Sequence, residues 1–254
     1  MEKVLLAGIV TYTGIVLYLY FSQSAHIYFP TPQDFENCPE LVHAEKITHN
    51  GTRMYYIQNT KANTLVVIYH GNGGSACDRA FLADYLNDQG VATILVEYVG
   101  YSNDTRTPSE TLIFNDVNNV NSFIKSLNYD RLVILGESLG SGPATYHTTL
   151  TGIDSLILIT PFTSLADAGA FHYPYLPVKL LIRDKYDNGK HLRAYEGKLT
   201  IIHGTNDTVI PFSLGQRLYA GANTQNKQFI TIDGAGHNDI YSQQKTFDAI
   251  SDAL

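Results

Sequence analysis

The sequence predicts one α/β domain on a mostly parallel central sheet flanked by helices, preceded by an N-terminal transmembrane or signal segment. Short apolar runs typical of strands alternate with segments of helical periodicity from residue 65 to the C terminus. Strands separated by helices imply parallel pairing. The near-continuous apolar character of these strands fits a sheet that helices cover on both faces. An uncharged apolar run at residues 4–21 stands apart from this alternation.

Composition and charge narrow the classes of function. With 254 residues, of which 44% are hydrophobic, the chain is long enough for one substantial core. A net charge of -7 and the lack of any run of lysine or arginine argue against a surface that neutralises phosphates, so nucleic acid is not an expected partner. No metal or cofactor is expected. Cys38 and Cys77 are expected to be small buried thiols, with a disulfide between them as the alternative in an oxidising compartment.

Residues 4–21 are interpreted as a single-pass membrane anchor within an N-terminal segment of residues 1–21. The run just reaches the length needed to cross a bilayer. Lys3 precedes it and the next lysine or arginine is Lys46, a charge asymmetry that places the remaining chain outside the cytoplasm. The alternatives are a cleaved signal peptide, which would leave a secreted or periplasmic protein, and a buried helix of a soluble protein.

The segment of residues 22–44 is expected to form an extended linker or arm, because three prolines lie among its polar residues. The ordered domain is expected over residues 45–254. It should open with an antiparallel edge hairpin, since Asn50-Gly51 is a dipeptide favoured in tight hairpin turns and strand-like segments flank it.

The remaining strands and helices are expected to alternate with one interruption. The expected strands are residues 65–69, 92–96, 132–135, 156–159, 199–203 and 228–232. The expected helices are residues 79–89, 109–127, 143–150, 214–220 and 243–254. Between residues 165 and 198 prolines, aromatic residues and alternating charges break the pattern, with a short helical patch near residues 178–184. This segment is interpreted as a short inserted cap.

A serine lies between two glycines in the segment Gly136-Glu137-Ser138-Leu139-Gly140, directly after an apolar strand and before a helical stretch of small residues. A strand that turns abruptly into a helix holds its turn residue in strained geometry, and the flanking glycines leave room for it. Ser138 is therefore the expected nucleophile. A turn serine in a nucleotide-binding loop is the alternative, but the segment lacks the lysine of a P-loop.

A serine nucleophile needs an adjacent base, and the base needs an acid that fixes its tautomer. Loops after the carboxyl ends of parallel strands meet at one edge of a sheet. Asp207 follows the strand at residues 199–203, and His237 follows the next strand, so both are expected beside Ser138. This order predicts a triad of Ser138, His237 and Asp207.

Other titratable residues have simpler expected roles. His70 and His203 should hold loops by hydrogen bonds. Asp233, Asp239 and a carboxylate in the helical region after residue 160 are the weaker candidates for the acid, and Glu137 should form a structural salt bridge or hydrogen bond.

The order Ser, Asp, His and the segments around these residues resemble the α/β-hydrolase superfamily over roughly residues 60–250. The segment HGNGG at residues 70–74 is similar to the family's loop after an early strand, and the segment GTNDTVIP at residues 204–211 is similar to its acid loop. The resemblance implies an oxyanion hole made by the backbone N–H groups of Asn72 and Leu139. The most similar branch includes Bem46-like and serine-aminopeptidase-like proteins, although Val99 stands where that branch often has an arginine.

The expected activity is hydrolysis of an acyl ester, as a carboxylesterase or lipid-like acyl hydrolase, because the short cap is rich in aromatic residues that suit an apolar acyl group. An aminopeptidase and an acyl thioesterase are the alternatives within hydrolases. A peptidase usually needs an acidic cluster for the substrate's amine, and the sequence places none. A non-catalytic, membrane-tethered binding module is the alternative from another class. Degenerate members of the family usually lose a triad residue, and this chain keeps all three.

Overall fold

The structure, a computed structural model, describes residues 1–150 and 152–254. The strands are β1 (Phe29–Pro30), β2 (Glu45–His49), β3 (Thr52–Ile57), β4 (Thr64–Tyr69), β5 (Gly73–Gly74), β6 (Ala92–Glu97), β7 (Arg131–Glu137), β8 (Ser155–Ile159), β9 (Lys198–Gly204) and β10 (Lys227–Ile232). The α-helices are α1 (Glu2–Phe21), α2 (Gln23–Ile27), α3 (Ala80–Asp88), α4 (Glu110–Ile124), α5 (Ser141–His147), α6 (Leu165–His172), α7 (Val178–Leu181), α8 (Asn188–His191), α9 (Phe212–Gly221) and α10 (Gln244–Ala253). Short 3-10 helices are η1 (Pro39–Leu41), η2 (Cys77–Arg79), η3 (Ser138–Gly140), η4 (Leu192–Ala194) and η5 (Ile240–Ser242).

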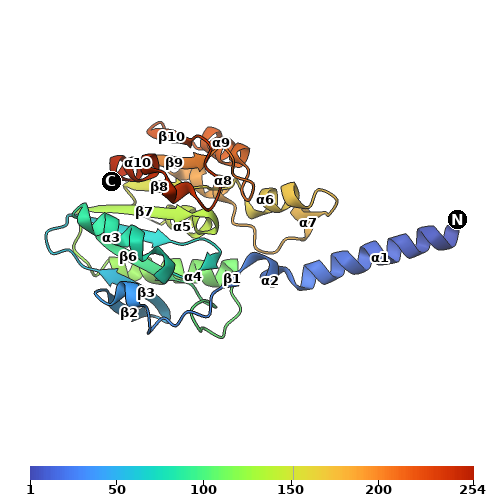
Figure 1. Ribbon diagram of the computed structural model, residues 1–254, viewed down its shortest axis with the longest axis horizontal. Coiled ribbons are helices and arrows are strands. Elements are labelled where there is room, and N and C mark those ends of the chain that lie inside the picture. Colours follow the sequence, from blue (N-terminus) through green and yellow to red (C-terminus); the bar gives the residue numbers. More distant parts are fainter. Residues whose placement is uncertain (151) are drawn as a thin grey trace.

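The long strands form one eight-stranded sheet in the order β10-β9-β8-β7-β4-β6-β3-β2 (Figure 1). The neighbours from β10 to β6 pair in parallel, whereas β3 runs antiparallel to both β6 and β2. The predicted mostly parallel sheet is confirmed, and the predicted hairpin lies at its edge. Both residues of the hairpin turn have positive φ, 51° at Asn50 and 83° at Gly51, as a type I′ turn requires.

Alternate side chains of the central strands pack on opposite faces of the sheet. In β4, Leu65, Val67 and Tyr69 join the core under α4, α5 and α9. Val66 and Ile68 join the core under α3 and α10. A strand buried on both faces shows no polar alternation, which is why these strands appear in the sequence as continuous apolar runs.

The chain reverses its direction across the sheet between β4 and β7. The connection that leaves β4 passes through α3 to β6 on one side, and the connection that leaves β7 passes through α5 to β8 on the other. Between the carboxyl ends of two such strands the loops diverge and leave a crevice, the usual ligand position in open α/β sheets. The loop of residues 70–76 and the turn at Ser138 both begin at this point.

The arm of residues 22–44 is not a free linker, and ordered structure begins before residue 45. Tyr28, Phe35 and Leu41 are buried in the two cores. Strand β1 of the arm pairs with β5, which lies in the loop after β4. This packing could not be predicted from the sequence pattern, because the residues that contact the arm are distant in the chain. Contacts between distant segments leave no local periodicity.

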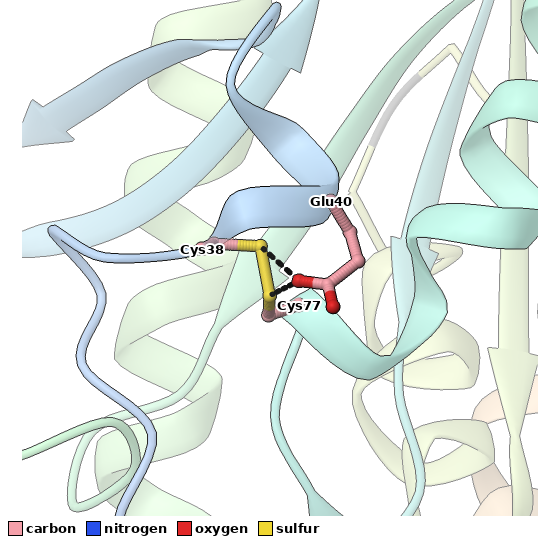
Figure 2. Close-up of side chains that lie close together, drawn as sticks. All are labelled: Cys38, Glu40 and Cys77. Carbon is pink, nitrogen blue, oxygen red and sulfur yellow. Dashed lines mark hydrogen bonds between the residues drawn. A yellow bond between two sulfur atoms is a disulfide. The ribbon is translucent and has the colours of Figure 1, made fainter.

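Cys38 and Cys77 form a disulfide, so the expectation of two unpaired thiols is wrong. Figure 2 shows this bond between the arm and η2, with the Glu40 carboxylate beside both sulfurs. The two Cα atoms are 5.9 Å apart, a separation that a disulfide spans. Because the sulfurs are bonded to each other, neither cysteine offers a thiolate to a metal. The bond ties the arm to the end of the loop after β4.

The double substitution Cys38→Ser/Cys77→Ser is expected to lower the free energy of unfolding by about 4 kcal/mol, because it releases a loop across a sequence separation of 39 residues. Urea denaturation followed by circular dichroism measures the change. A reductant should move the wild-type midpoint towards that of the variant and leave the variant unaffected. A wild-type midpoint that does not respond to the reductant would contradict the bond.

The segment between β8 and β9 carries the predicted cap, which begins with α6 and α7. Helix α6 was not predicted, because only Ala168 is buried among its eight residues and it therefore has no apolar stripe of helical spacing. The N-terminal apolar run forms α1, which projects away from the domain beside α7 (Figure 1). Its 20 residues and mean hydropathy of 2.0 meet the length and composition of a membrane-crossing helix.

Candidate active site

Ser138 lies at a sharp turn between β7 and η3, which leads directly into α5. Its φ of 51° is in the left-handed region, a strained conformation for a residue with a side chain. The flanking glycines are required by close packing. A Cβ on Gly136 would overlap Ala144, and a Cβ on Gly140 would overlap the carbonyl oxygen of Tyr69. The predicted strand–turn–helix context of Ser138 is confirmed.

The structure brings the three residues predicted for the triad into one hydrogen-bonded line. Ser138 Oγ lies 3.0 Å from His237 Nε2, and His237 Nδ1 lies 2.7 Å from Asp207 Oδ2. The side chains come from the loops after β7, β9 and β10, which meet at one edge of the sheet. An ionised carboxylate only accepts hydrogen bonds, so His237 carries its proton on Nδ1. Its Nε2 is then free to accept the proton of Ser138 Oγ.

Four donors surround the Asp207 carboxylate. The backbone N–H groups of Val209 and Ile210 donate to Oδ1 at 2.9 and 2.7 Å. His237 and His203 face Oδ2 at 2.7 and 3.2 Å. Burial alone would raise the pKa of Asp207, but the hydrogen bonds from His203 and His237 help to hold this pKa well below its usual range. The acid is therefore ionised at neutral pH.

His203 holds the acid turn, the role expected from the sequence. Its Nε2 lies 3.0 Å from the carbonyl oxygen of Ile210 and 3.2 Å from Asp207 Oδ2. Both of these atoms are acceptors, so the ring carries a proton on Nε2. The other ring nitrogen lies against Gly215, where a Cβ would overlap it. His203 is thus a positioning residue between the acid loop and α9.

The loop after β4 places Asn72 at the same cavity as Ser138. The Asn72 carbonyl oxygen accepts from the backbone N–H of Phe29 at 3.1 Å and from Tyr101 Oη at 2.8 Å. Its side-chain amide donates to the carbonyl oxygen of Ile27 at 3.1 Å. Two of these three partners belong to the arm. The arm therefore fixes the backbone of the residue that the family resemblance assigns to the oxyanion hole.

Leu139, the second residue that the family resemblance assigns to the oxyanion hole, lies in η3 directly after Ser138 and lines the same cavity. The first N–H groups of a helix have no acceptor within the helix. The backbone N–H of Leu139 therefore has no acceptor within η3.

His70 supports the loop after β4, as expected. Its ring stacks on Tyr98 with the centroids 4.1 Å apart, and Tyr98 Oη donates to the carbonyl oxygen of His70 at 2.7 Å. His70 Nε2 lies 3.5 Å from Glu97 Oε1. The other oxygen of Glu97 accepts from the backbone N–H of Ala76, further along the same loop, at 3.2 Å. Val99, which stands where similar proteins often have an arginine, is buried in the core.

An ion pair and a hydrogen bond link three loops around Ser138. Arg79 Nε and Nη2 donate to the two carboxylate oxygens of Glu137 at 2.6 Å each, and Tyr241 Oη donates to Glu137 Oε2 at 3.0 Å. Arg79 follows the loop after β4, Glu137 directly precedes Ser138, and Tyr241 follows the loop that carries His237. Burial would raise the pKa of Glu137, but the Arg79 guanidinium lowers it below its usual range. The structural role predicted for Glu137 is confirmed.

A cavity of about 310 Å³ lies beside Ser138. Apolar side chains from α6 and α7, from the end of α1 and from the acid loop form most of its wall. The polar side chains in the wall include Gln23, His26 and His172. Among the residues that the structure describes, none that lines this cavity is acidic. A mostly apolar cavity with a few polar groups near its reactive end is typical of a small-molecule site.

A mostly parallel sheet whose central strand ends in a strained serine turn, with an acid and a histidine on later loops of the same edge, defines the α/β-hydrolase class. Residues 64–191 match the family model described as alpha/beta hydrolase fold, and the chain belongs to this family.

Individual relatives share different parts of the chain. An uncharacterized protein of Mycobacterium tuberculosis is 29% identical over 238 residues, covering 89% of this chain and 84% of that protein. Lysophosphatidylserine lipase ABHD12 of Mus musculus is 31% identical over 189 residues, covering 66% of this chain and 48% of the lipase. This chain thus matches about half the length of the lipase. Among solved structures, the Pyrococcus furiosus esterase Pf2001 has the same fold, with a TM-score of 0.71, 14% identity, and coverage of 90% of this chain and 98% of the esterase.

Proposed function

We propose that this protein is a membrane-anchored serine hydrolase that cleaves acyl esters, with carboxylic or lipid-like esters as its substrates. The observation that carries the proposal is the hydrogen-bonded line from Asp207 through His237 to Ser138, which ends at an apolar cavity. A serine with a base and an acid in this order performs acyl transfer. The similarity to a lysophosphatidylserine lipase supports a lipid ester as substrate.

In the proposed reaction, Ser138 Oγ attacks the carbonyl carbon while His237 Nε2 takes its proton, and Asp207 stabilises the imidazolium. The backbone N–H groups of Asn72 and Leu139 bind the oxyanion, each contributing about 3 kcal/mol of transition-state stabilisation. The ester C–O bond breaks as His237 returns the proton to the leaving alcohol. His237 then deprotonates a water molecule, which cleaves the acyl-enzyme and restores Ser138.

An ester is a better fit to the cavity than an aminoacyl amide. An aminopeptidase must bind the positively charged amine of its substrate, and a buried charge requires an opposite charge nearby. The described wall of the cavity has no acidic side chain to supply it. An acyl thioester would present the same apolar chain as an ester and is the second candidate, favoured by the same apolar wall.

A chain-length series of p-nitrophenyl esters, compared with aminoacyl p-nitroanilides, tests the substrate class. We expect kcat/KM to rise with acyl length up to the chain that fills the cavity, because each buried CH₂ group contributes about 0.8 kcal/mol, or roughly fourfold. Aminoacyl anilides should react at least about a hundredfold more slowly. A preference for aminoacyl anilides over every ester would reject the proposal.

The catalytic domain is placed on the non-cytoplasmic side in this proposal. The disulfide between Cys38 and Cys77 supports this placement, because such bonds persist mainly in oxidising compartments. The apolar helix α1 supplies the anchor.

A further inference from the structure

Three residues of α1 contribute to the wall of the active-site cavity. Val16, Leu19 and Tyr20 line it together with Ser138. Their spacing of three and four residues places them on one face of the helix. They are also partly buried, whereas neighbouring Leu17 is exposed. The last turns of α1 therefore have one face on the cavity and the other turned away from the protein.

Specific bonds hold the cap to α1 and to the turn that follows it. The Gln23 side-chain amide donates to the carbonyl oxygen of Leu181 at 3.0 Å and accepts from the backbone N–H of Arg183 at 2.9 Å. The Arg183 guanidinium lies 5.6 Å from the centre of the Tyr20 ring. Further along α1, Tyr12 Oη donates to the carbonyl oxygen of Tyr175 at 2.9 Å. The cap thus follows α1 for eight residues, which is about 12 Å along the helix axis.

The part of the cap that lies along α1 is apolar and exposed. Tyr175 is 89% exposed and Leu180 is 81% exposed, and Phe171 and Tyr173 are exposed beside them. A soluble protein rarely leaves such large apolar side chains in one exposed group. Here the group adjoins α1, where Tyr12 bonds to Tyr175, and α1 is long enough to cross a bilayer. A bilayer that surrounds α1 would also cover this cap surface.

Three of the four N–H groups within residues 173–178 have an acceptor in the protein, which suits an apolar environment. Within residues 173–178, Pro174 and Pro177 have no N–H group. The N–H groups of Tyr173, Leu176 and Val178 donate to carbonyl oxygens within residues 169–176. The carbonyl oxygen of Tyr175, at the tip, accepts from Tyr12 of α1.

The charged residues of the cap mark where its apolar part ends. Lys179 pairs with Asp167 at 2.6 Å, and Arg183 lies at Tyr20, near the C-terminal end of α1. Aromatic and basic side chains of this kind favour the headgroup level of a membrane. With Arg183 and Tyr20 at the headgroups, the tip at Tyr175 reaches about 12 Å deeper, into the hydrocarbon.

We propose that α1 is a substrate-binding element as well as an anchor, and that the cap turn of residues 171–178 inserts into the bilayer beside it. The cavity then opens to the hydrocarbon between α1 and the cap. An acyl chain passes sideways from the bilayer along Val16 and Leu19 to Ser138, without crossing water. The substrate class is a single-chain acyl ester resident in the membrane. This inference rests on the proposed ester hydrolysis, whose chemistry it leaves unchanged.

A pair of substitutions on α1 tests the substrate path. Leu19→Trp fills the cavity wall, and Leu17→Trp places the same side chain on the outer face. The full-length chain is reconstituted in phosphatidylcholine vesicles and assayed with embedded 1-oleoylglycerol and with soluble p-nitrophenyl butyrate. We expect Leu19→Trp to lower hydrolysis of 1-oleoylglycerol by about tenfold or more, and to lower hydrolysis of the shorter butyrate ester by a smaller factor. Leu17→Trp should match the wild type on both esters.

Equal rates for the two tryptophan variants on 1-oleoylglycerol, with the butyrate ester still cleaved, would overturn the path through α1 and leave the hydrolase intact. A wild-type protein that cleaves neither ester would instead reject the proposed function. These two failures are therefore distinguishable.

Insertion of the cap is tested separately by fluorescence, because the natural chain contains no tryptophan. Single Tyr175→Trp, Leu17→Trp and Val42→Trp variants are placed in vesicles that contain brominated phosphatidylcholine. Val42 is 80% exposed and precedes the edge strand β2, which Figure 1 shows away from α1. We expect quenching at positions 175 and 17 and none at position 42. An unquenched tryptophan at position 175 would contradict insertion of the cap.

Discussion

The substitution Ser138→Ala is expected to lower kcat for p-nitrophenyl esters by roughly 10⁶-fold, the scale seen when a serine hydrolase loses its nucleophile. The fold should be retained, because alanine has the same Cβ as serine and adds no strain at a φ of 51°. The Ser138 hydroxyl contacts His237 Nε2, so its loss removes the reacting atom. The hydrogen bond between His237 and Asp207 should stay in place.

Ser126→Ala is the matched control for this measurement. Ser126 is exposed, and its hydroxyl donates to the Phe123 carbonyl oxygen at the end of α4. Its activity should equal that of the wild type. A Ser138→Ala protein that keeps full ester activity would show that the reaction does not pass through this residue.

Asp207→Asn is expected to lower kcat by about 10⁴-fold, because it changes which ring nitrogen of His237 carries the proton. The amide oxygen must occupy the position of Oδ1, because that position accepts from the N–H groups of Val209 and Ile210. The amide NH₂ group then faces His237 and His203, which both donate to Oδ2 in the wild type. His237 has to accept at Nδ1 and carry its proton on Nε2, where it can no longer take the proton of Ser138.

Two further measurements make the Asp207 result specific. Asp233→Asn, at an exposed aspartate after β10, should leave kcat unchanged.

Because the pKa of Asp207 is lowered by folding, its carboxylate stabilises the folded chain at neutral pH, and this stabilisation is lost as the pH falls through the acid range. Rates are therefore compared per folded molecule, with circular dichroism as the check. A folded Asp207→Asn protein of normal activity would remove the acid from the mechanism.

The sheet and the meeting of Ser138, His237 and Asp207 at one edge were predictable because their signals are local. Each central strand is buried on both faces and appears as an apolar run, and steric crowding at Gly136 and Gly140 requires glycine on both sides of Ser138. The loops of Asp207 and His237 follow such runs, so the parallel topology alone brings them to one edge.

Three features depend on contacts between distant segments: the packing of the arm, the disulfide and the Arg79–Glu137 ion pair. The sequence pattern does not indicate which distant segments lie close together. Phe29 meets Asn72 through backbone bonds that any residue could make, and Cys38 meets Cys77 only because the arm folds back along the domain. Arg79 and Glu137 are separated by 58 residues. The cap helix α6 was missed for a different reason, since only Ala168 among its eight residues is buried.

The proposed mechanism requires Ser138 to be a nucleophile that its hydrogen-bonded partners activate in the folded protein. Reaction of the full-length chain with a fluorophosphonate, followed by peptide mass spectrometry, measures this reactivity. We expect one phosphonylated residue, Ser138, with labelling abolished in Ser138→Ala and strongly slowed in Asp207→Asn. Folded protein that stays unlabelled, or a label on a different residue, would show that Ser138 is not the activated nucleophile.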